Sequence, residues 1–246
     1  MAQPQENPEA VAQPELKKRQ RPVIAIDGPA GAGKSTLAAH LARRFGFLNL
    51  ETGAMYRALA LKAIENDYAF DEEAPLMDLA GHTRITLQPQ LEGNRVLLDG
   101  LDVSRRIREA DVTSAASKVS VHPHLRAWMV QQQRALGEAG GVVMEGRDIG
   151  TVVFPNADVK IFVVADPEVR ARRRTLEAQA RGEAADEAAI LADILARDER
   201  DRNRAVAPLK PAKDAYLLDN SHLDIEGGVR AAIDIIEAVR AGRREV

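Results

Sequence analysis

The chain has 246 residues, of which 45% are hydrophobic and 29% are charged, a composition ordinary for a globular protein with a substantial core. Its formal net charge of -3 gives no strongly basic surface, so we expect neither nucleic acid nor an acidic membrane as a partner. The absence of cysteine excludes disulfides and thiolate metal sites. Since no apolar run approaches the ~20 residues that span a bilayer, we expect a cytoplasmic protein.

The first 21 residues differ in composition from the rest of the chain. They are rich in Gln, Pro, Glu and Lys and contain no large apolar cluster, so they cannot bury enough surface to offset their ordering entropy. We predict that residues 1–21 form a disordered tail and that residues 22–240 form one domain with insertions.

The first strand and helix of that domain flank a glycine-rich loop. Val23–Asp27 is a short apolar run typical of a buried strand. A helix is predicted over Lys34–Phe45 because its apolar residues recur on one face, and Gly46 is placed to end it. This order is the beginning of a βαβ pattern around a parallel sheet.

The loop between them, GPAGAGKS at residues 28–35, satisfies the P-loop pattern G-x-x-x-x-G-K-[ST] in its required strand-to-helix context. Glycines allow a tight turn in which backbone N–H groups converge on phosphates, and the start of the helix adds positive charge. Lys34 then reaches the β- and γ-phosphates, and the Ser35 hydroxyl binds Mg²⁺. The motif predicts nucleotide binding but not its purpose, because switches, motors and kinases all contain it.

A second site is suggested after the next predicted strand, Phe47–Leu50. Thr52 is a plausible N-cap for the helix that follows, which would place Arg57 in its first turns. Open α/β sheets bind ligands at such strand ends. A single arginine at this position is equally compatible with an ordinary surface residue.

Residues 85–103 interrupt the alternation of strands and helices. Ile85–Leu91 and Arg95–Val103 are predicted to form a β-hairpin that turns at Glu92-Gly93-Asn94. A helix is predicted from Pro123 to about residue 139, where Gly140-Gly141 would end it. We interpret the hairpin as an antiparallel insertion into a parallel fold.

The third strand of the sheet, Val142–Glu145, leads directly into Gly146-Arg147-Asp148. If the topology is conventional, this turn lies at the carboxyl edge of the sheet, close to the P-loop. A guanidinium and a carboxylate would then face the nucleotide site. The alternative is a structural ion pair within a turn.

An arginine-rich segment, residues 170–204, follows the predicted strand Val159–Ala165. Near its end, Arg197, Asp201 and Arg204 are spaced i, i+4 and i+7, so one helical face would present two cations around one anion. The segment has few apolar residues in its middle and is predicted to be mobile. Taken alone, a helix of this kind is also compatible with a solvated surface rich in salt bridges.

The domain is predicted to end with a fifth strand and a helix. The strand is Tyr216–Asp219, and the helix places Val229, Ile233, Ile236 and Val239 on one stripe. The fold class predicted for the whole domain is therefore α/β, a P-loop core with a five-stranded parallel sheet.

The combined motifs resemble the cytidylate kinases of bacterial type, within the nucleoside monophosphate kinases. The resemblance runs from about Val23 to Ile236. It is based on GPAGAGKST at 28–36, TGAMYR at 52–57, AAS at 115–117 with Arg126, GRDIGTVVFP at 146–155 and RDERDRNRAVAPL at 197–209. It implies a monophosphate-binding insertion at about residues 60–125 and an arginine-rich lid at about 170–205.

The resemblance also implies roles for individual residues. Lys34, Arg147, Arg197 and Arg204 would be catalytic, and Ser35 would bind Mg²⁺ together with ATP. Residues implied to bind ATP are Gly28, Pro29, Ala30, Gly31, Ala32, Gly33, Lys34, Ser35, Thr36, Arg170 and Arg174. Residues implied to bind CMP are Thr52, Tyr56, Arg57, Ser117, Arg126, Arg147, Asp148, Arg197, Asp201 and Arg204.

Within the CMP set, the resemblance assigns Arg57, Arg147 and Arg204 to the phosphate, and Ser117, Arg126 and Asp148 to the cytosine ring. Tyr56, Arg197 and Asp201 would hold the ribose region. One departure from some relatives is Glu145, where those have Asp, which puts the distance to a Mg²⁺-bound water in doubt.

The expected reaction is ATP-dependent phosphorylation of CMP and dCMP to CDP and dCDP, in pyrimidine nucleotide metabolism, by a monomer that uses Mg²⁺. Two alternatives remain open. Another P-loop kinase, acting on AMP, UMP or an alcohol, would lack the constellation of Ser117, Arg126 and Asp148. A regulatory or nucleic-acid-binding ATPase would hydrolyse ATP without an acceptor and would need a more basic surface.

Overall fold

The computed structural model describes residues 21–90 and 93–242, and a five-stranded parallel sheet is at its centre. The strands are β1 (Val23–Asp27), β2 (Leu48–Glu51), β6 (Val142–Gly146), β7 (Val159–Val164) and β8 (Tyr216–Asp219), in the order β2-β6-β1-β7-β8. Central strand β1 is buried along its whole length, which explains its apolar sequence up to Asp27. The predicted α/β class and all five strands are confirmed, with ends that differ by at most one residue.

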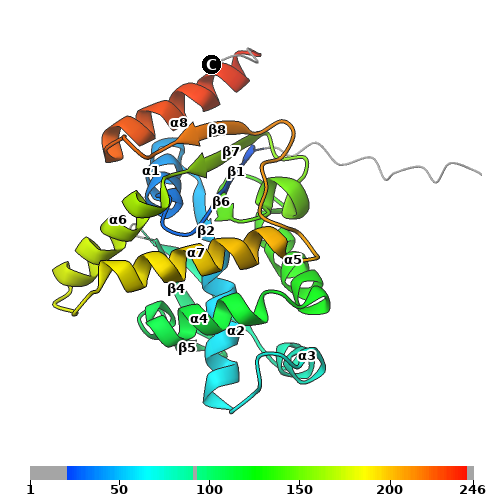
Figure 1. The fold of residues 1–246 in the computed structure, drawn as a ribbon. Helices are drawn as coiled ribbons and strands as arrows, with labels where there is room; N and C mark the ends of the chain where they lie inside the picture. The colour runs from blue at the N-terminus through cyan, green and yellow to red at the C-terminus, as the bar shows by residue number, and fades with distance from the viewer. Residues whose placement is uncertain (1–20, 91–92, 243–246) are drawn as a thin grey trace, which may run out of the picture.

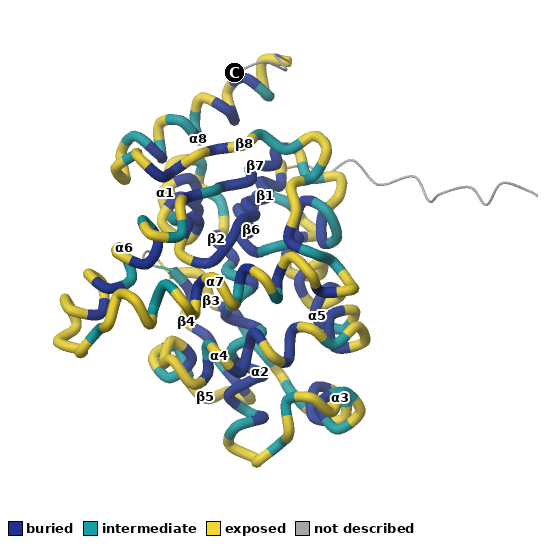
Figure 2. The backbone as a smooth tube through the Cα atoms, in the orientation of Figure 1, coloured by how far each residue is buried: buried dark blue, intermediate teal, exposed yellow. Residues whose placement is uncertain are grey.

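Helices cover both faces of the sheet and create two hydrophobic cores (Figures 1 and 2). On one face, α1 (Lys34–Phe45) and α8 (Ile225–Arg240) pack against β1, β7 and β8. On the other, α2 (Thr52–Glu65), α4 (Ala110–Val119) and α5 (Pro123–Gly137) bury their apolar residues, together with α3 (Glu73–Gly81). Gly46 has the left-handed conformation predicted for the end of α1.

Residues 85–102 form a separate antiparallel sheet of three strands, β3 (Ile85–Gln90), β4 (Gly93–Leu98) and β5 (Leu101–Asp102). The predicted hairpin is confirmed, but its second strand was predicted too long. Asp99 and Gly100, both with positive φ, turn the chain after β4. Within the predicted turn, Gly93 and Asn94 belong to β4, and Glu92 lies outside the described residues.

The arginine-rich segment is an antiparallel pair of helices, α6 (Pro167–Ala180) and α7 (Glu187–Asn203). In Figures 1 and 2, α7 crosses the molecule between the sheet and the group formed by α2, α4 and α5. The segment has more apolar anchoring than its sequence indicated, since Ala171 and Ile194 are completely buried. This position brings the end of α7 next to the carboxyl edge of the sheet.

Two further predictions concern the ends of elements and of the chain. Thr52 is not the N-cap of α2, because the helix begins at Thr52 itself and Glu51 precedes it. The predicted tail lies outside the described residues except for Arg21, whose guanidinium donates to the Gly46 carbonyl at 2.7 Å. Within residues 21–90 and 93–242, no helix is long and apolar enough to cross a membrane.

Candidate functional site

The P-loop has a shape that only glycine permits at two positions. A Cβ atom on Gly28 would lie 2.1 Å from the Val163 carbonyl oxygen of β7. Gly33 has φ of 93° and forms the N-cap of α1, and a Cβ there would lie 2.5 Å from Asn220 Nδ2. The loop is therefore held tightly against β7 and Asn220, with the start of α1 directed toward its interior.

Lys34 is buried beneath this loop. Its Nζ donates to the Pro29 carbonyl at 2.6 Å, so the loop encloses the ammonium group. Burial and the repulsion from Arg147 lower the pKa of Lys34 to about 7, although the Glu145 carboxylate opposes the shift. A bound phosphate would restore the full positive charge.

Ser35 and Glu145 bring two oxygen ligands together beside the loop. Ser35 Oγ donates to Glu145 Oε2 at 2.9 Å, and Glu145 Oε1 is buried without a hydrogen-bond partner among the described residues. Burial and the negative charge of Glu51 raise the pKa of Glu145 to about 7. A hydroxyl beside an unsatisfied carboxylate oxygen fits a hard cation such as Mg²⁺, which prefers oxygen ligands.

The Arg147-Asp148 turn is fixed by a carboxylate from the neighbouring strand. Asp27, the last residue of β1, accepts from the backbone N–H of Ile149 at 2.8 Å and of Gly150 at 2.7 Å. Burial raises the pKa of Asp27 to about 6, although these two N–H groups oppose the shift. β1 therefore positions both the P-loop and the turn that presents Arg147 and Asp148.

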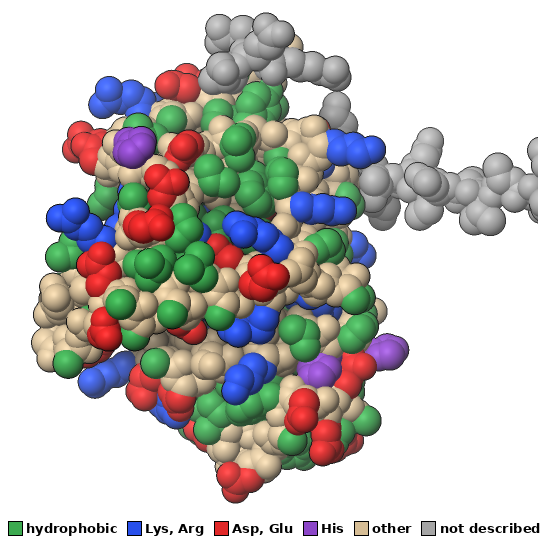
Figure 3. Space-filling model, in the orientation of Figure 1, with side chains coloured by type: hydrophobic (Ala, Val, Ile, Leu, Met, Phe, Trp, Pro, Cys, Tyr) green, Lys and Arg blue, Asp and Glu red, His purple; other side chains and the backbone are tan. Residues whose placement is uncertain are grey.

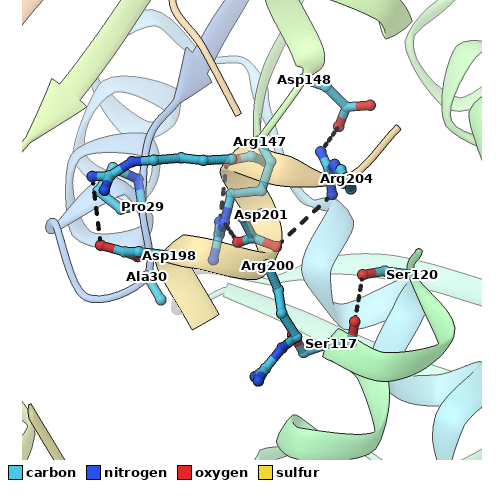
Figure 4. A network of polar contacts seen from close by, with 12 residues as sticks. Pro29, Ala30, Ser117, Ser120, Arg147, Asp148, Asp198, Arg200, Asp201 and Arg204 are labelled. Atoms are coloured by element: carbon cyan, nitrogen blue, oxygen red, sulfur yellow. Dashed lines mark hydrogen bonds and ion pairs between the residues drawn. The ribbon is translucent and has the colours of Figure 1, made fainter. Parts of the chain in front are cut away.

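A group of buried polar side chains lies where that turn faces α4 and α5. Arg126 Nη2 donates to Asp148 Oδ2 at 2.5 Å, and Arg126 Nη1 donates to the Ser120 carbonyl at 3.0 Å. The guanidinium carbon of Arg126 lies 5.5 Å from the centre of the Tyr56 ring. Ser117 on α4 is also buried, and its Oγ accepts from Arg200 of α7 at 3.3 Å (Figure 4).

Four arginines converge beside this group. Arg147 Nε donates to Asp201 at 3.0 Å, and Arg204 lies 3.9 Å from the same carboxylate (Figure 4). In the described part of the chain, Arg57 Nε, Arg197 Nε and Arg204 Nη2 are buried without hydrogen-bond partners, although Arg204 Nη2 lies 3.8 Å from Asp148 Oδ1. Burial and the repulsion from Arg147 lower the pKa of Arg197 to about 10. Buried guanidiniums that keep unused hydrogen-bond donors fit a multiply charged anion.

The sequence placed Arg197, Asp201 and Arg204 on one helical face, and the structure modifies this arrangement. α7 ends at Asn203, and Arg204 caps it while its Nε donates to the Ala207 carbonyl at 2.5 Å. The close partner of Asp201 is not on α7. It is Arg147, in the turn that follows β6.

Arg170 lines neither of the two cavities beside the P-loop, so the structure gives no support to its predicted contact with ATP. Its side chain is 1% exposed and forms an ion pair of 2.7 Å with Asp198. The same guanidinium donates to the Ala165 carbonyl at 2.9 Å and to the Ala30 carbonyl of the P-loop at 3.1 Å. Arg170 thus joins α6, α7 and the P-loop. Arg174, one turn later, does line the site.

Sequence reasoning missed several residues that shape the site. Asp27 had a local signal, since it ends a strand directly before the P-loop. Asp198 lies inside the recognised RDERDRNR run, but nothing local distinguished it from its neighbours. Arg173 donates to the Asn220 carbonyl at 2.7 Å, and Glu51 forms an ion pair with Arg57. The contact of Arg173 with Asn220 joins segments far apart in the sequence, and the pairing of Glu51 with Arg57 depends on the burial of both side chains.

Two adjoining cavities are lined by most of the predicted residues, but Gly28, Pro29, Ala32 and Arg170 line neither. The arginine cavity, of about 340 Å³, is lined by all ten residues predicted to bind CMP. The P-loop cavity, of about 640 Å³, lies between α6 and the loop after β8 and is lined by Gly31, Gly33, Lys34, Ser35, Thr36 and Arg174, among others. The site can therefore hold two anionic ligands side by side.

The cytidylate kinase family model matches residues 24–238, nearly all of the described domain. The chain belongs to the cytidylate kinase family. A cytidylate kinase of Bradyrhizobium diazoefficiens is 56% identical over 222 residues, which cover 90% of this chain and 98% of that protein. A cytidylate kinase of Rhodopseudomonas palustris is 55% identical over 225 residues, covering 91% of this chain and all of that protein.

One solved structure was also compared with this member of the cytidylate kinase family. Shikimate kinase from Bacteroides thetaiotaomicron is 14% identical with a TM-score of 0.44, covering 87% of this chain and 98% of that chain. A score this low adds nothing to the assignment. Membership of the cytidylate kinase family rests on the family model and the curated relatives.

Proposed function

We propose that this protein transfers the γ-phosphoryl group of ATP to CMP and forms CDP and ADP. The observation that supports this most directly is the arginine cavity, where a buried Arg126–Asp148 pair and Ser117 lie beside four arginines. One end of the cavity suits a polar ring and the other suits a phosphate. The family assignment supports the same substrates.

Cytosine fits the polar end of the cavity by its pattern of donors and acceptors. Asp148 accepts from the exocyclic amine of cytosine, and Arg126 donates to the ring nitrogen and carbonyl. Ser117 adds a hydroxyl to the lining of this end of the cavity. Uracil would place its carbonyl against the Asp148 carboxylate, and two opposed acceptors disfavour binding.

The phosphate of CMP is bound at the other end by Arg57, Arg147 and Arg204. Each carries a forked guanidinium that suits a phosphate, and Arg57 and Arg204 have buried donors that lack hydrogen-bond partners within the described residues. Tyr56, Arg197, Asp201 and Thr52 surround the ribose region. We propose that dCMP is also a substrate.

ATP occupies the P-loop cavity, with its phosphates directed toward Lys34. The backbone of residues 28–36 encloses the phosphates, and Arg174 contacts them from α6. Mg²⁺ would be held by Ser35 and the phosphates and would supply charge neutralisation. The Glu145 carboxylate would accept a hydrogen bond from a water molecule bound to Mg²⁺. The longer Glu145 side chain keeps a carboxylate within 2.9 Å of the Ser35 hydroxyl.

The protein's chemical work is alignment and charge stabilisation. The CMP phosphate is already an anion, so no general base is required. Lys34 lines both cavities, Arg147, Arg197 and Arg204 line the arginine cavity, and together they stabilise charge on the transferred group. Closure of α6 and α7, the proposed lid, excludes water that would otherwise accept the phosphoryl group.

The remaining assignments follow from the same reading. Residues 60–125 form the monophosphate-binding insertion, and residues 170–205 form the lid. We propose a monomer that acts in pyrimidine nucleotide metabolism in the cytoplasm. Acidic and basic side chains are interspersed on the face shown in Figure 3, which gives no support to a nucleic-acid-binding ATPase.

An acceptor screen tests this function. ADP release from ATP would be coupled to an optical readout, with CMP, dCMP, UMP, AMP and shikimate offered separately and without any acceptor. We expect CMP to give the highest kcat/KM. Faster turnover with another acceptor, or hydrolysis that no acceptor stimulates, would contradict the proposal.

A further inference from the structure

Arg108 lies at the end of a short 3-10 turn, η1 (Arg106–Arg108), between β5 and α4. The turn is anchored by its two other residues. Ile107 is completely buried in the core, and Arg106 makes two hydrogen bonds to Asp111, at 2.8 and 2.6 Å. With those anchors in place, Arg108 presents its side chain from a fixed backbone, and that side chain is 57% exposed.

The partner of Arg108 is Glu51, at the carboxyl end of β2. Arg108 Nη2 lies 3.6 Å from Glu51 Oε2, while Arg57 takes the other oxygen of the same carboxylate. Burial tends to raise the pKa of Glu51, but the two guanidiniums outweigh it and hold that pKa below its usual range. A separation of 3.6 Å exceeds hydrogen-bond length, so Arg108 can exchange this ion pair for a closer acceptor.

Arg108 also lies where the two cavities meet. The arginine cavity and the P-loop cavity share Gly31, Lys34, Ser35, Arg108, Arg174 and Glu177 in their linings. Three of these are cations, and each comes from a different part of the fold: Lys34 from the P-loop, Arg174 from α6 and Arg108 from the insertion. The phosphates of the two ligands must meet at this junction.

We propose that Arg108 is a further catalytic residue, which leaves Glu51 and donates hydrogen bonds to the phosphoryl group as it passes between the nucleotides. The inference rests on the proposed function. During transfer, an oxygen of the CMP phosphate bonds to the γ-phosphorus, and the bond to the bridging oxygen breaks with its electrons passing to ADP. Arg108 neutralises charge on the equatorial oxygens from the insertion side, and no proton is transferred.

The test compares Arg108→Gln with Arg105→Gln. Arg105 belongs to the same segment, is exposed and lines neither cavity. For Arg108→Gln we expect kcat to fall by roughly 10²-fold, the effect of removing one charged donor in a transition state. Arg105→Gln should keep the wild-type kcat. If Arg108→Gln does not fold, Arg108→Lys replaces it, with an expected loss of about tenfold because the fork is missing.

Binding separates this role from a structural one. The probe is an inert bisubstrate analogue, cytidine and adenosine joined through five phosphates. We expect Arg108→Gln to weaken its binding by about tenfold or more while the Kd for CMP alone changes by less than about threefold. An equal loss for both ligands, or binding and kcat like those of Arg105→Gln, would overturn the proposal. Wild-type protein inactive with CMP would instead refute the proposed function, and this inference with it.

Discussion

Replacement of Asp148 by Asn changes one atom at the point where the proposed base selection takes place. The side chain of Asp148 is 7% exposed, and its Oδ2 accepts from Arg126 Nη2 at 2.5 Å. Arg126 can only donate, so the new amide must turn its oxygen toward Arg126. Its NH₂ group then occupies the other side, where Oδ1 lies 3.8 Å from Arg204 in the wild-type protein.

The fixed amide orientation sets the size of the effect. Cytosine would place its amine against an NH₂ group, whereas uracil would gain a donor for its carbonyl. An unpaired buried group costs about 1–3 kcal/mol, and the change affects the two substrates in opposite directions. With about 1.4 kcal/mol per tenfold, we expect the CMP to UMP ratio of kcat/KM to fall by roughly 10²-fold.

The assay measures kcat/KM for CMP and UMP on the same preparation, so loss of folded protein cancels in the ratio. Asp198→Asn is the matched control. Asp198 forms an ion pair with Arg170 at 2.7 Å, and both side chains are as buried as the Arg126–Asp148 pair, but they lie under the P-loop. That variant should lose stability and keep the ratio. An unchanged ratio in Asp148→Asn, or an equal fall in the control, would refute the reasoning.

Three further predictions follow. Lys34→Ala should stay folded, by thermal melting, and lose roughly 10²-fold or more in kcat; a folded variant that keeps more than about a tenth of the activity would show that Lys34 is misassigned. Burial tends to raise the pKa of Asp201, but Arg147, Arg197 and Arg204 hold it below the usual value. Its stabilisation is therefore present above about pH 4 and lost as pH falls through the folded pKa, so urea unfolding should show the difference between wild type and Asp201→Asn shrinking on acidification; a growing difference would contradict this. Finally, amide hydrogen exchange across residues 170–204 should slow when the bisubstrate analogue binds and change less with either nucleotide alone. High protection in the free protein, unchanged by the analogue, would indicate a rigid structural helix pair.

Local signals in the sequence were sufficient for most of the fold. Apolar runs identified all five strands, since a parallel sheet covered on both faces favours predominantly apolar strands such as Val23–Asp27. The P-loop and the Arg147-Asp148 turn were recognised because their glycines and charged residues are close together in the sequence, at the spacing that phosphate binding requires. The turn at Asp99-Gly100 also had a local signal, a dipeptide typical of tight turns, which a single long strand prediction overlooked.

The rest depended on contacts between distant segments. From the sequence, Arg170 was indistinguishable from the other arginines of the predicted lid. Its ion pair with Asp198 is apparent only from the packing of α6 against α7 and the P-loop. Asp27 acts through the register of β1 against β6, in which it lies opposite Gly146. Neither the register of a parallel pair nor the burial of one arginine among many can be derived from spacing along the chain.

The strand order also affects how this protein is made. β1 is synthesised first, yet both of its neighbours, β6 and β7, come from the second half of the chain. During synthesis, this fully buried strand therefore remains unpaired until partners from the second half of the chain emerge, and such distant pairings form slowly. The segment most exposed to misassembly is thus the one that leads into the P-loop, and a chain that stops before β6 would leave it without an edge to pair with.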